Sequence, residues 1–205
     1  MDWPIFHFLN HSLVGHDLLA DEVADFTTMS LWIFPVAVVV LWLLGRPGTR
    51  SPLRMAAVAA PLAALVGLGV NQVVSHIWAR ARPTVAHPGQ AHLFFVPPSG
   101  DPSFPSDHAT GAFAIAFAVF FLSRRAGVVL LVLATLVALS RVFVGLHYPS
   151  DVGAGLLIGA SAAWAVTRFG RPVTGRLVDF IGRISDPIVG PLWRRAARGR
   201  AAAQG

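Results

Sequence analysis

Long apolar segments alternate with short polar or turn-rich segments along most of this chain. Residues 45–52 and 83–105 are rich in proline and glycine, and each separates two apolar stretches. A helix needs about 20 apolar residues to cross a bilayer. The pattern therefore predicts five spans, of which the third is short, at residues 26–44, 55–74, 109–122, 127–144 and 152–166. We expect an all-α integral membrane helical bundle.

The two ends of the chain differ from the spans. Residues 2–25 mix apolar side chains with several carboxylates, which is typical of one or two amphipathic helices lying in the membrane interface. From residue 168 onward the chain is basic and partly amphipathic, so we expect it to lie on the membrane surface and then fray. The predicted organisation is a membrane-embedded domain over 1–170, with 1–25 as its interfacial segment, and a basic cytoplasmic tail over 171–205.

Composition supports this interpretation and predicts an orientation. Of the 205 residues 55% are hydrophobic and 13% are charged, cysteine is absent, and the mean hydropathy is +0.63. All 16 basic residues are arginine, and they are interleaved with apolar spans, so we interpret the net charge of +6 as a topology signal and not as a nucleic-acid surface. Most arginines fall in the loop before residue 55, at 124–125 and in the tail, a side that we expect to be cytoplasmic. All eight histidines fall at the opposite face.

Three polar islands interrupt the apolar pattern at the outer ends of the predicted spans. They are residues 80–83 (Arg-Ala-Arg-Pro), residues 104–109 (Phe-Pro-Ser-Asp-His-Ala) and residues 140–151. Ionisable groups at membrane depth are costly, and they therefore indicate function by default. Each island alone has an ordinary interpretation as a helix cap or an interfacial anchor. Their joint occurrence at one face predicts a site.

The residue types in the islands suit phosphoryl transfer. Guanidiniums match phosphate oxygens, and Ser106 precedes a predicted helix whose free N–H groups also favour an anion. A neutral histidine can attack phosphorus while a protonated one delivers a proton to the leaving oxygen. Asp151, four residues after His147, is placed to hold that imidazole as the nucleophile, which leaves His108 as the acid. Because the arginines would neutralise the transition state, we expect no metal and no other cofactor.

The islands resemble the three motifs of the type 2 phosphatidic acid phosphatase superfamily of membrane lipid phosphatases. The Ser-Arg-x5-His-x3-Asp motif is matched completely by residues 140–151, and the Pro-Ser-Gly-His motif by residues 105–108 with Asp107 in place of glycine. The Lys-x6-Arg-Pro motif keeps residues 82–83, but Ser75 stands at the lysine position. The Arg-x-Arg-Pro and Pro-Ser-Asp-His forms, with a short acidic N-terminal segment, resemble the bacitracin-resistance branch, whose members are undecaprenyl pyrophosphate phosphatases.

The resemblance implies a set of site residues. It carries the roles of nucleophile, general acid and orienting carboxylate onto His147, His108 and Asp151. Arg80 is the nearby cation that would replace the missing lysine, and Asp107 would repel phosphate unless it caps the helix or pairs with an arginine. The residues implied at the phosphate site are Arg82, Arg141, Ser106, Arg80 and Asp107.

The implied reaction is removal of the terminal phosphate of undecaprenyl diphosphate at the outer leaflet, which recycles the monophosphate carrier for cell-wall synthesis. The expected partners are this lipid diphosphate and the bilayer, with no nucleic acid, and the expected location is the cell membrane with the site facing outside. Two alternatives remain: a broader lipid phosphatase acting on phosphatidate or phosphatidylglycerophosphate, and a non-catalytic lipid-phosphate binder or transporter. The pairing of His147 with Asp151 argues against the binder, which has no use for an oriented nucleophile.

Overall fold

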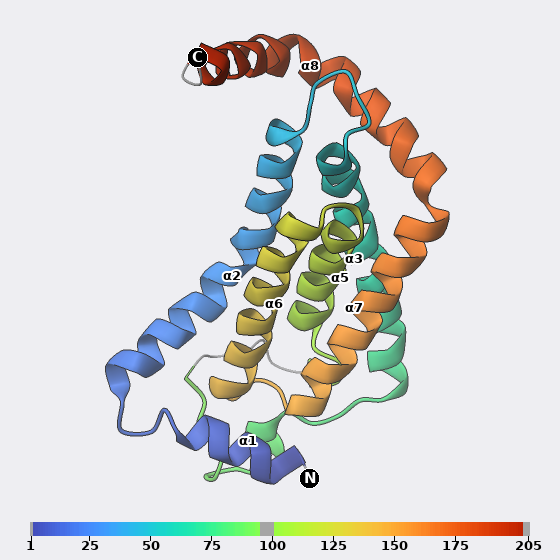
Figure 1. Cartoon of the computed structure of the whole chain (residues 1–205). Helices are drawn as coiled ribbons and strands as arrows, with labels where there is room; N and C mark the ends of the chain where they lie inside the picture. The colour runs from blue at the N-terminus through green and yellow to red at the C-terminus, as the bar shows by residue number, and fades with distance from the viewer. Residues whose placement is uncertain (1, 95–100, 203–205) are drawn as a thin grey trace.

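The computed structural model describes residues 2–94 and 101–202, and every regular element within those ranges is a helix (Figure 1). The predicted all-α architecture is therefore confirmed. The elements in chain order are α1 (Asp2–His11), α2 (Asp17–Leu44), α3 (Pro52–Ile77), α4 (Pro83–Ala86), α5 (Asp107–Leu122), α6 (Arg124–Phe143), α7 (Pro149–Phe169) and α8 (Arg171–Ala202).

The predicted spans correspond to long apolar helices. Helices α3, α6 and α7 are each long and apolar enough to cross a bilayer, and α5 is a shorter apolar helix of 16 residues. Helix α2 meets the same requirement when its two parts are taken as one span. Within the described ranges there are thus three candidate spans, or four with α2, besides the short α5. This confirms a helical membrane bundle.

Helix α2 bends by 48° between Asp17–Ser30 and Trp32–Leu44. Pro35 lies inside the helix. It has no N–H to donate to the carbonyl oxygen of residue 31, and its ring clashes with that carbonyl, which accounts for the bend at residue 31. The acidic segment 17–25, which the sequence assigned to the interfacial part, is continuous with the apolar residues in this helix. The bend turns this segment away from the bundle (Figure 1).

Helix α5 is the centre of the bundle and packs against α3, α6 and α7. Its buried positions are mostly alanine, and α7 presents Gly155 and Gly159 to it. Small residues allow helix backbones to approach closely, which is the usual basis of helix packing in membranes. A side chain at Gly155 or Gly159 would meet atoms of α5 at 3.0 Å or less, whereas one at Gly153 would meet open space.

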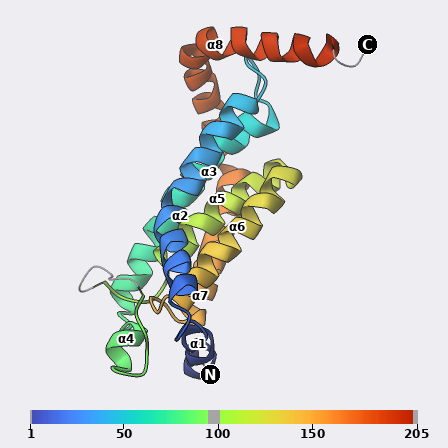
Figure 2. The same cartoon turned by 90° about the vertical axis from the view of Figure 1, so that its left-hand side faces the viewer.

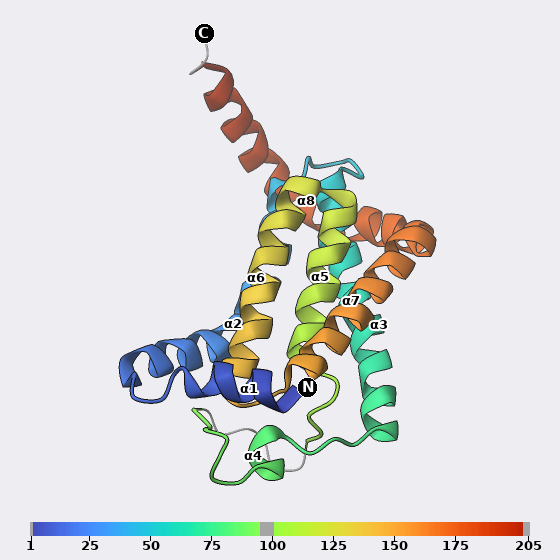
Figure 3. The same cartoon turned by 60° about the horizontal axis from the view of Figure 1, so that its bottom comes forward.

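The two ends of the bundle differ. Helices α1 and α4 lie at one end, where α1 contacts α6 and α7; Figure 3 turns this end toward the viewer. Helix α8 lies at the other end, and its last part runs away from the bundle (Figure 2). The tail, which was expected to fray, is helical as far as Ala202. Its first part is tied down because Arg54, only 1% exposed, pairs with Asp186 at 2.5 Å.

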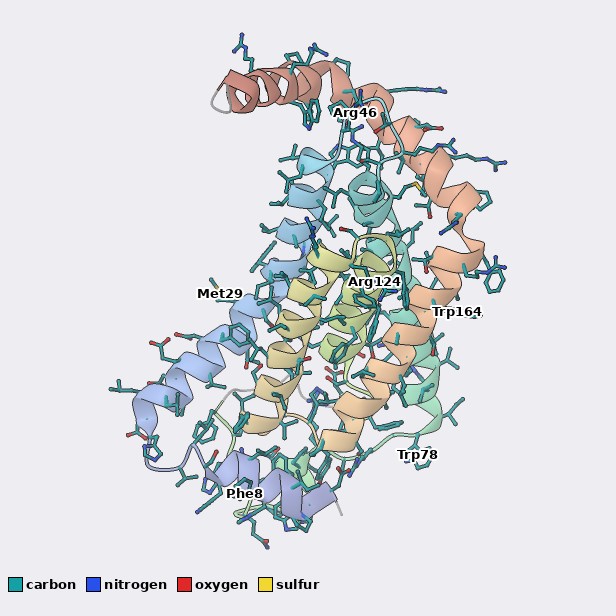
Figure 4. All side chains as sticks on the ribbon, viewed as in Figure 1. Phe8, Met29, Arg46, Trp78, Arg124 and Trp164 are labelled. Carbon is teal, nitrogen blue, oxygen red and sulfur yellow. The ribbon has the colours of Figure 1, made fainter. Side chains whose placement is uncertain are left out.

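The outer surface of the bundle is apolar. Met29 and Trp164 point away from it in Figure 4 and are 63% and 55% exposed, as lipid-facing side chains are. Arg46 lies at the end near α8, whereas Phe8 and Trp78 lie near the α1 end.

Candidate active site

The three polar islands meet at the α1 end of the bundle, around a cavity of about 440 Å³. Five of the eight residues implied by the sequence line it: Arg82, Asp107, His108, Arg141 and His147. The rest of the wall comes mainly from the end of α3 and from the loop before α5, through Gln72, Ser75, His76, Ala79, Asp101, Pro102 and Pro105. Ser75, at the position of the missing lysine, thus faces the cavity.

His147 lies in the turn between α6 and α7 and is buried. Its Nδ1 is 2.8 Å from the carbonyl oxygen of Ser103 and 3.8 Å from Oδ2 of Asp151. A carbonyl oxygen only accepts hydrogen bonds, so Nδ1 carries the proton and Nε2 keeps its lone pair. The shorter contact is therefore with a main-chain oxygen that the sequence motifs did not indicate, although Asp151 is adjacent as predicted.

The environment of His147 favours the neutral imidazole. Burial, reinforced by the positive charges of Arg141 and Arg82, holds the pKa of His147 well below its usual value. A neutral imidazole with a free Nε2 is the form that attacks an electrophile.

Asp151 lies behind His147 and has no exposed surface. It occupies the third position of α7, where its carboxylate accepts hydrogen bonds from the backbone N–H of Tyr148 at 2.8 Å and the hydroxyl of Ser103 at 2.5 Å. Ser103 thus contacts both members of the predicted pair, His147 through its carbonyl oxygen and Asp151 through its hydroxyl. The position of Ser103 depends on how a loop folds, so no motif in the sequence revealed it.

Arg80 was expected at the phosphate site, but the structure does not bring it to the cavity wall. Its guanidinium instead donates hydrogen bonds to Asp2 at 2.9 Å and to Asp151 at 2.8 Å, and it lies 3.8 Å from the centre of the Tyr148 ring. In this arrangement the guanidinium pairs with two carboxylates, and the expectation that Arg80 replaces the missing lysine stays a prediction.

Ser106 also lies outside the cavity wall, because it caps the first turn of α5. Its hydroxyl accepts a hydrogen bond from the backbone N–H of Ala109, and the residue is fully buried. Asp107, in contrast, lines the cavity and accepts a hydrogen bond from the amide of Asn71. The carboxylate is thus held by a neutral amide, which was neither of the two partners that the sequence suggested.

Arg82 and Arg141 are the cations of the cavity wall. Arg82 is positioned by two main-chain oxygens, of Asp101 at 3.2 Å and of Leu146 at 3.1 Å. Arg141 is 6% exposed, and its Nε finds no hydrogen-bond partner within the described part of the chain. Buried polar groups are normally hydrogen-bonded, so such a donor beside His147 indicates a place for an oxyanion.

The chain is similar in sequence to known proteins. The PAP2 superfamily profile matches residues 56–174. The chain is 31% identical over 199 residues to undecaprenyl-diphosphatase BcrC of Bacillus subtilis (strain 168), covering 95% of this chain and 97% of that protein. It is 38% identical over 128 residues to putative undecaprenyl-diphosphatase YbjG of Escherichia coli (strain K12), covering 62% and 61% of the two chains.

A solved structure shares the fold. The LpxE structure from Aquifex aeolicus superposes with a TM-score of 0.66 at 24% identity, covering 82% of this chain and 95% of that one. The superfamily profile covers more than half of the chain, and the Bacillus relative matches almost all of it. The chain therefore belongs to the PAP2 superfamily of membrane phosphatases.

Proposed function

We propose that this protein hydrolyses undecaprenyl diphosphate to undecaprenyl phosphate and inorganic phosphate through a phosphohistidine on His147. The observation that carries the proposal is the cavity in which a neutral imidazole, a second histidine and two guanidiniums face one another. Two relatives named as undecaprenyl-diphosphatases support the choice of substrate.

In the first step the terminal phosphate of the substrate lies between Arg82 and Arg141, and its phosphorus faces Nε2 of His147. The new N–P bond forms as the bond from phosphorus to the bridging oxygen breaks. His108 gives its proton to that oxygen, so undecaprenyl phosphate leaves as the product. The negative charge of the bound diphosphate favours the protonated form of His108 before this transfer.

In the second step water hydrolyses the phosphohistidine. The neutral His108 accepts a proton from water as the water oxygen bonds to phosphorus and the N–P bond breaks. Inorganic phosphate is released, and His147 returns to its neutral form. The arginines stabilise the charge on the phosphoryl oxygens in both transition states, so the scheme uses no metal.

The orientation is part of the proposal. The α1 end, which holds the cavity, faces the outside of the cell, and the end near α8 faces the cytoplasm. Arginines in the loop before α3, at the start of α6 and in α8 support this assignment, because cytoplasmic loops carry the excess of basic residues.

The proposal is tested by measuring phosphate release from undecaprenyl diphosphate by purified protein in detergent with EDTA present. Wild type is compared with His147→Ala and with a matched control, His16→Ala, which removes an exposed histidine that does not line the cavity. We expect release in wild type and in His16→Ala and none in His147→Ala. Release by wild type that EDTA abolishes, or that His147→Ala retains, would contradict the mechanism.

The substrate assignment is tested by the same assay on phosphatidate and phosphatidylglycerophosphate. We expect undecaprenyl diphosphate to have the highest kcat/KM of the three. A higher value for either glycerolipid would identify a broader lipid phosphatase. Absence of release from all three lipids would favour a binder.

A further inference from the structure

A chain of polar contacts links the first helix to the buried carboxylate behind His147. Asp2, at the start of α1, accepts a hydrogen bond from Nη2 of Arg80 at 2.9 Å and one from the backbone N–H of Ser150 at 3.1 Å. Arg80 donates from Nη1 to Oδ1 of Asp151 at 2.8 Å. Asp2 and Arg80 are 78 residues apart in sequence, so only folding brings them together.

The contacts of Arg80 leave it poorly placed to serve as a phosphate ligand. Nη1 donates hydrogen bonds to Asp151 and to the hydroxyl of Ser150, and Nη2 donates one to Asp2. The guanidinium carbon lies over the Tyr148 ring. Burial works to lower the pKa of Arg80, but the hydrogen bond that Arg80 donates to Asp2 and the charges of both carboxylates outweigh it and raise that pKa. Arg80 therefore stays a cation that is committed to two carboxylates.

Asp151 depends on this cation. A carboxylate with no exposed surface costs several kcal/mol in lost hydration unless a positive partner and hydrogen bonds compensate it. Among the described residues, Arg80 is the arginine that forms an ion pair with Asp151, at 2.8 Å. The other ionisable group near this carboxylate is Nδ1 of His147, at the longer distance of 3.8 Å. Without Arg80 the buried carboxylate would keep its hydrogen bonds from Tyr148 and Ser103 but would lose its arginine partner.

Asp151 in turn positions the nucleophile. Its Oδ2 accepts a hydrogen bond from the hydroxyl of Ser103, and the carbonyl oxygen of Ser103 accepts a hydrogen bond from Nδ1–H of His147. A displacement of Asp151 would therefore move both the carboxylate and the carbonyl that orient the imidazole.

We propose that Arg80 and Asp2 are positioning residues of the active site: Arg80 holds Asp151 in place, and Asp2, on the N-terminal helix, holds Arg80. The inference rests on the proposed function, because it concerns the rate of attack by His147. It makes α1 part of the active site and not only an interfacial anchor.

The test is a double-mutant cycle on Asp2→Asn and Arg80→Ala, with kcat and KM measured for a lipid diphosphate and a lipid monophosphate. A misplacement of about 1 Å can cost about a hundredfold in rate, so we expect Arg80→Ala to lower kcat by about tenfold to a hundredfold on both substrates, with KM little changed. Asp2→Asn should lower kcat less, and it should have no further effect in the Arg80→Ala background, since the two act through one contact. Asp2→Glu, which keeps the carboxylate, should remain close to wild type.

Matched controls are Asp21→Asn and Arg46→Ala, which remove an exposed carboxylate and an exposed guanidinium away from the cavity. Arg80→Ala that raises KM for the diphosphate more than for the monophosphate, at constant kcat, would overturn the inference and restore Arg80 as a phosphate ligand. Additive losses in the cycle would overturn the role of Asp2. Wild type and His147→Ala are assayed in parallel, so a failed phosphatase proposal (no release by wild type) is distinguished from a failed positioning proposal (active wild type, unaffected variants).

Discussion

Substitution of Gly159 by alanine tests how closely the rate depends on the packing of α7 against α5. A Cβ at this position would lie 2.7 Å from the backbone nitrogen of Ala114 and 2.7 Å from the carbonyl oxygen of Thr110, both on α5. Neither atom belongs to a flexible side chain, so neither can rotate away. The helices themselves would have to separate.

The size of the movement follows from these distances. Ordinary van der Waals contacts of a Cβ atom begin at 3.4 Å, and a Cβ at residue 159 would lie 2.7 Å from the backbone of α5. The two helices would therefore have to move apart by about 0.7 Å. Helix α5 carries His108 near its start, and α7 carries Asp151. Overpacking of this kind costs about 1–3 kcal/mol. A displacement approaching 1 Å between catalytic groups lowers the rate by up to about a hundredfold.

The control is Gly153→Ala on the same helix, where a Cβ would meet nothing within 4 Å. Alanine there should be neutral or should stabilise α7 by up to about 1 kcal/mol, because it favours helix more than glycine does. We expect Gly159→Ala to lower the melting temperature in detergent, and to lower kcat for phosphate release by about tenfold or more. Gly153→Ala should leave both quantities near wild type. Equal kcat and equal melting temperature in the two variants would refute the packing argument.

Three further predictions concern the rest of the molecule. Arg54→Ala should destabilise the protein by an amount near the lower end of the 3–5 kcal/mol range typical of breaking a buried ion pair, because Asp186 is 22% exposed; an unchanged melting temperature would contradict the role of this pair in holding α8. The pKa of His147 is lowered by burial and by two guanidiniums, so Arg82→Ala should raise it and move the acid limb of kcat/KM to higher pH; a shift to lower pH would contradict this assignment. Because the chain has no cysteine, Arg46→Cys provides a single label site that a membrane-impermeant maleimide should reach only after intact cells are permeabilised; labelling of intact cells would invert the proposed orientation.

Much of the fold was predictable because hydropathy is read directly from the sequence. A membrane-spanning helix must satisfy its own backbone hydrogen bonds and present apolar side chains to lipid, so its position follows from local composition. The limits of α2 were less predictable. Its first turns carry carboxylates, and they join the span because nothing breaks the helix before the bend that Pro35 causes.

The candidate site was predictable where it is local in sequence. Arg141, His147 and Asp151 lie within residues 140–151, at the end of α6, in the turn and at the start of α7, so a short turn brings them together. The resemblance of the chain to the PAP2 superfamily, which rested partly on these residues, is confirmed. Their individual catalytic roles stay predictions until variants are assayed.

Other parts of the site depend on contacts between distant segments. The main-chain oxygen of Ser103 that holds His147 is chemically the same in every residue, so no side-chain pattern distinguishes it. The hydrogen bond from Asn71 to Asp107 joins two helices.

Local sequence was enough to predict a membrane helical bundle with histidines, arginines and a carboxylate gathered at one end. The ion pairs of Arg80 with Asp2 and Asp151, in contrast, follow from how the chain folds. A long arginine side chain can reach a compensating charge that is near in space but far along the chain. That charge was supplied by a residue 78 positions away, which no local pattern indicates.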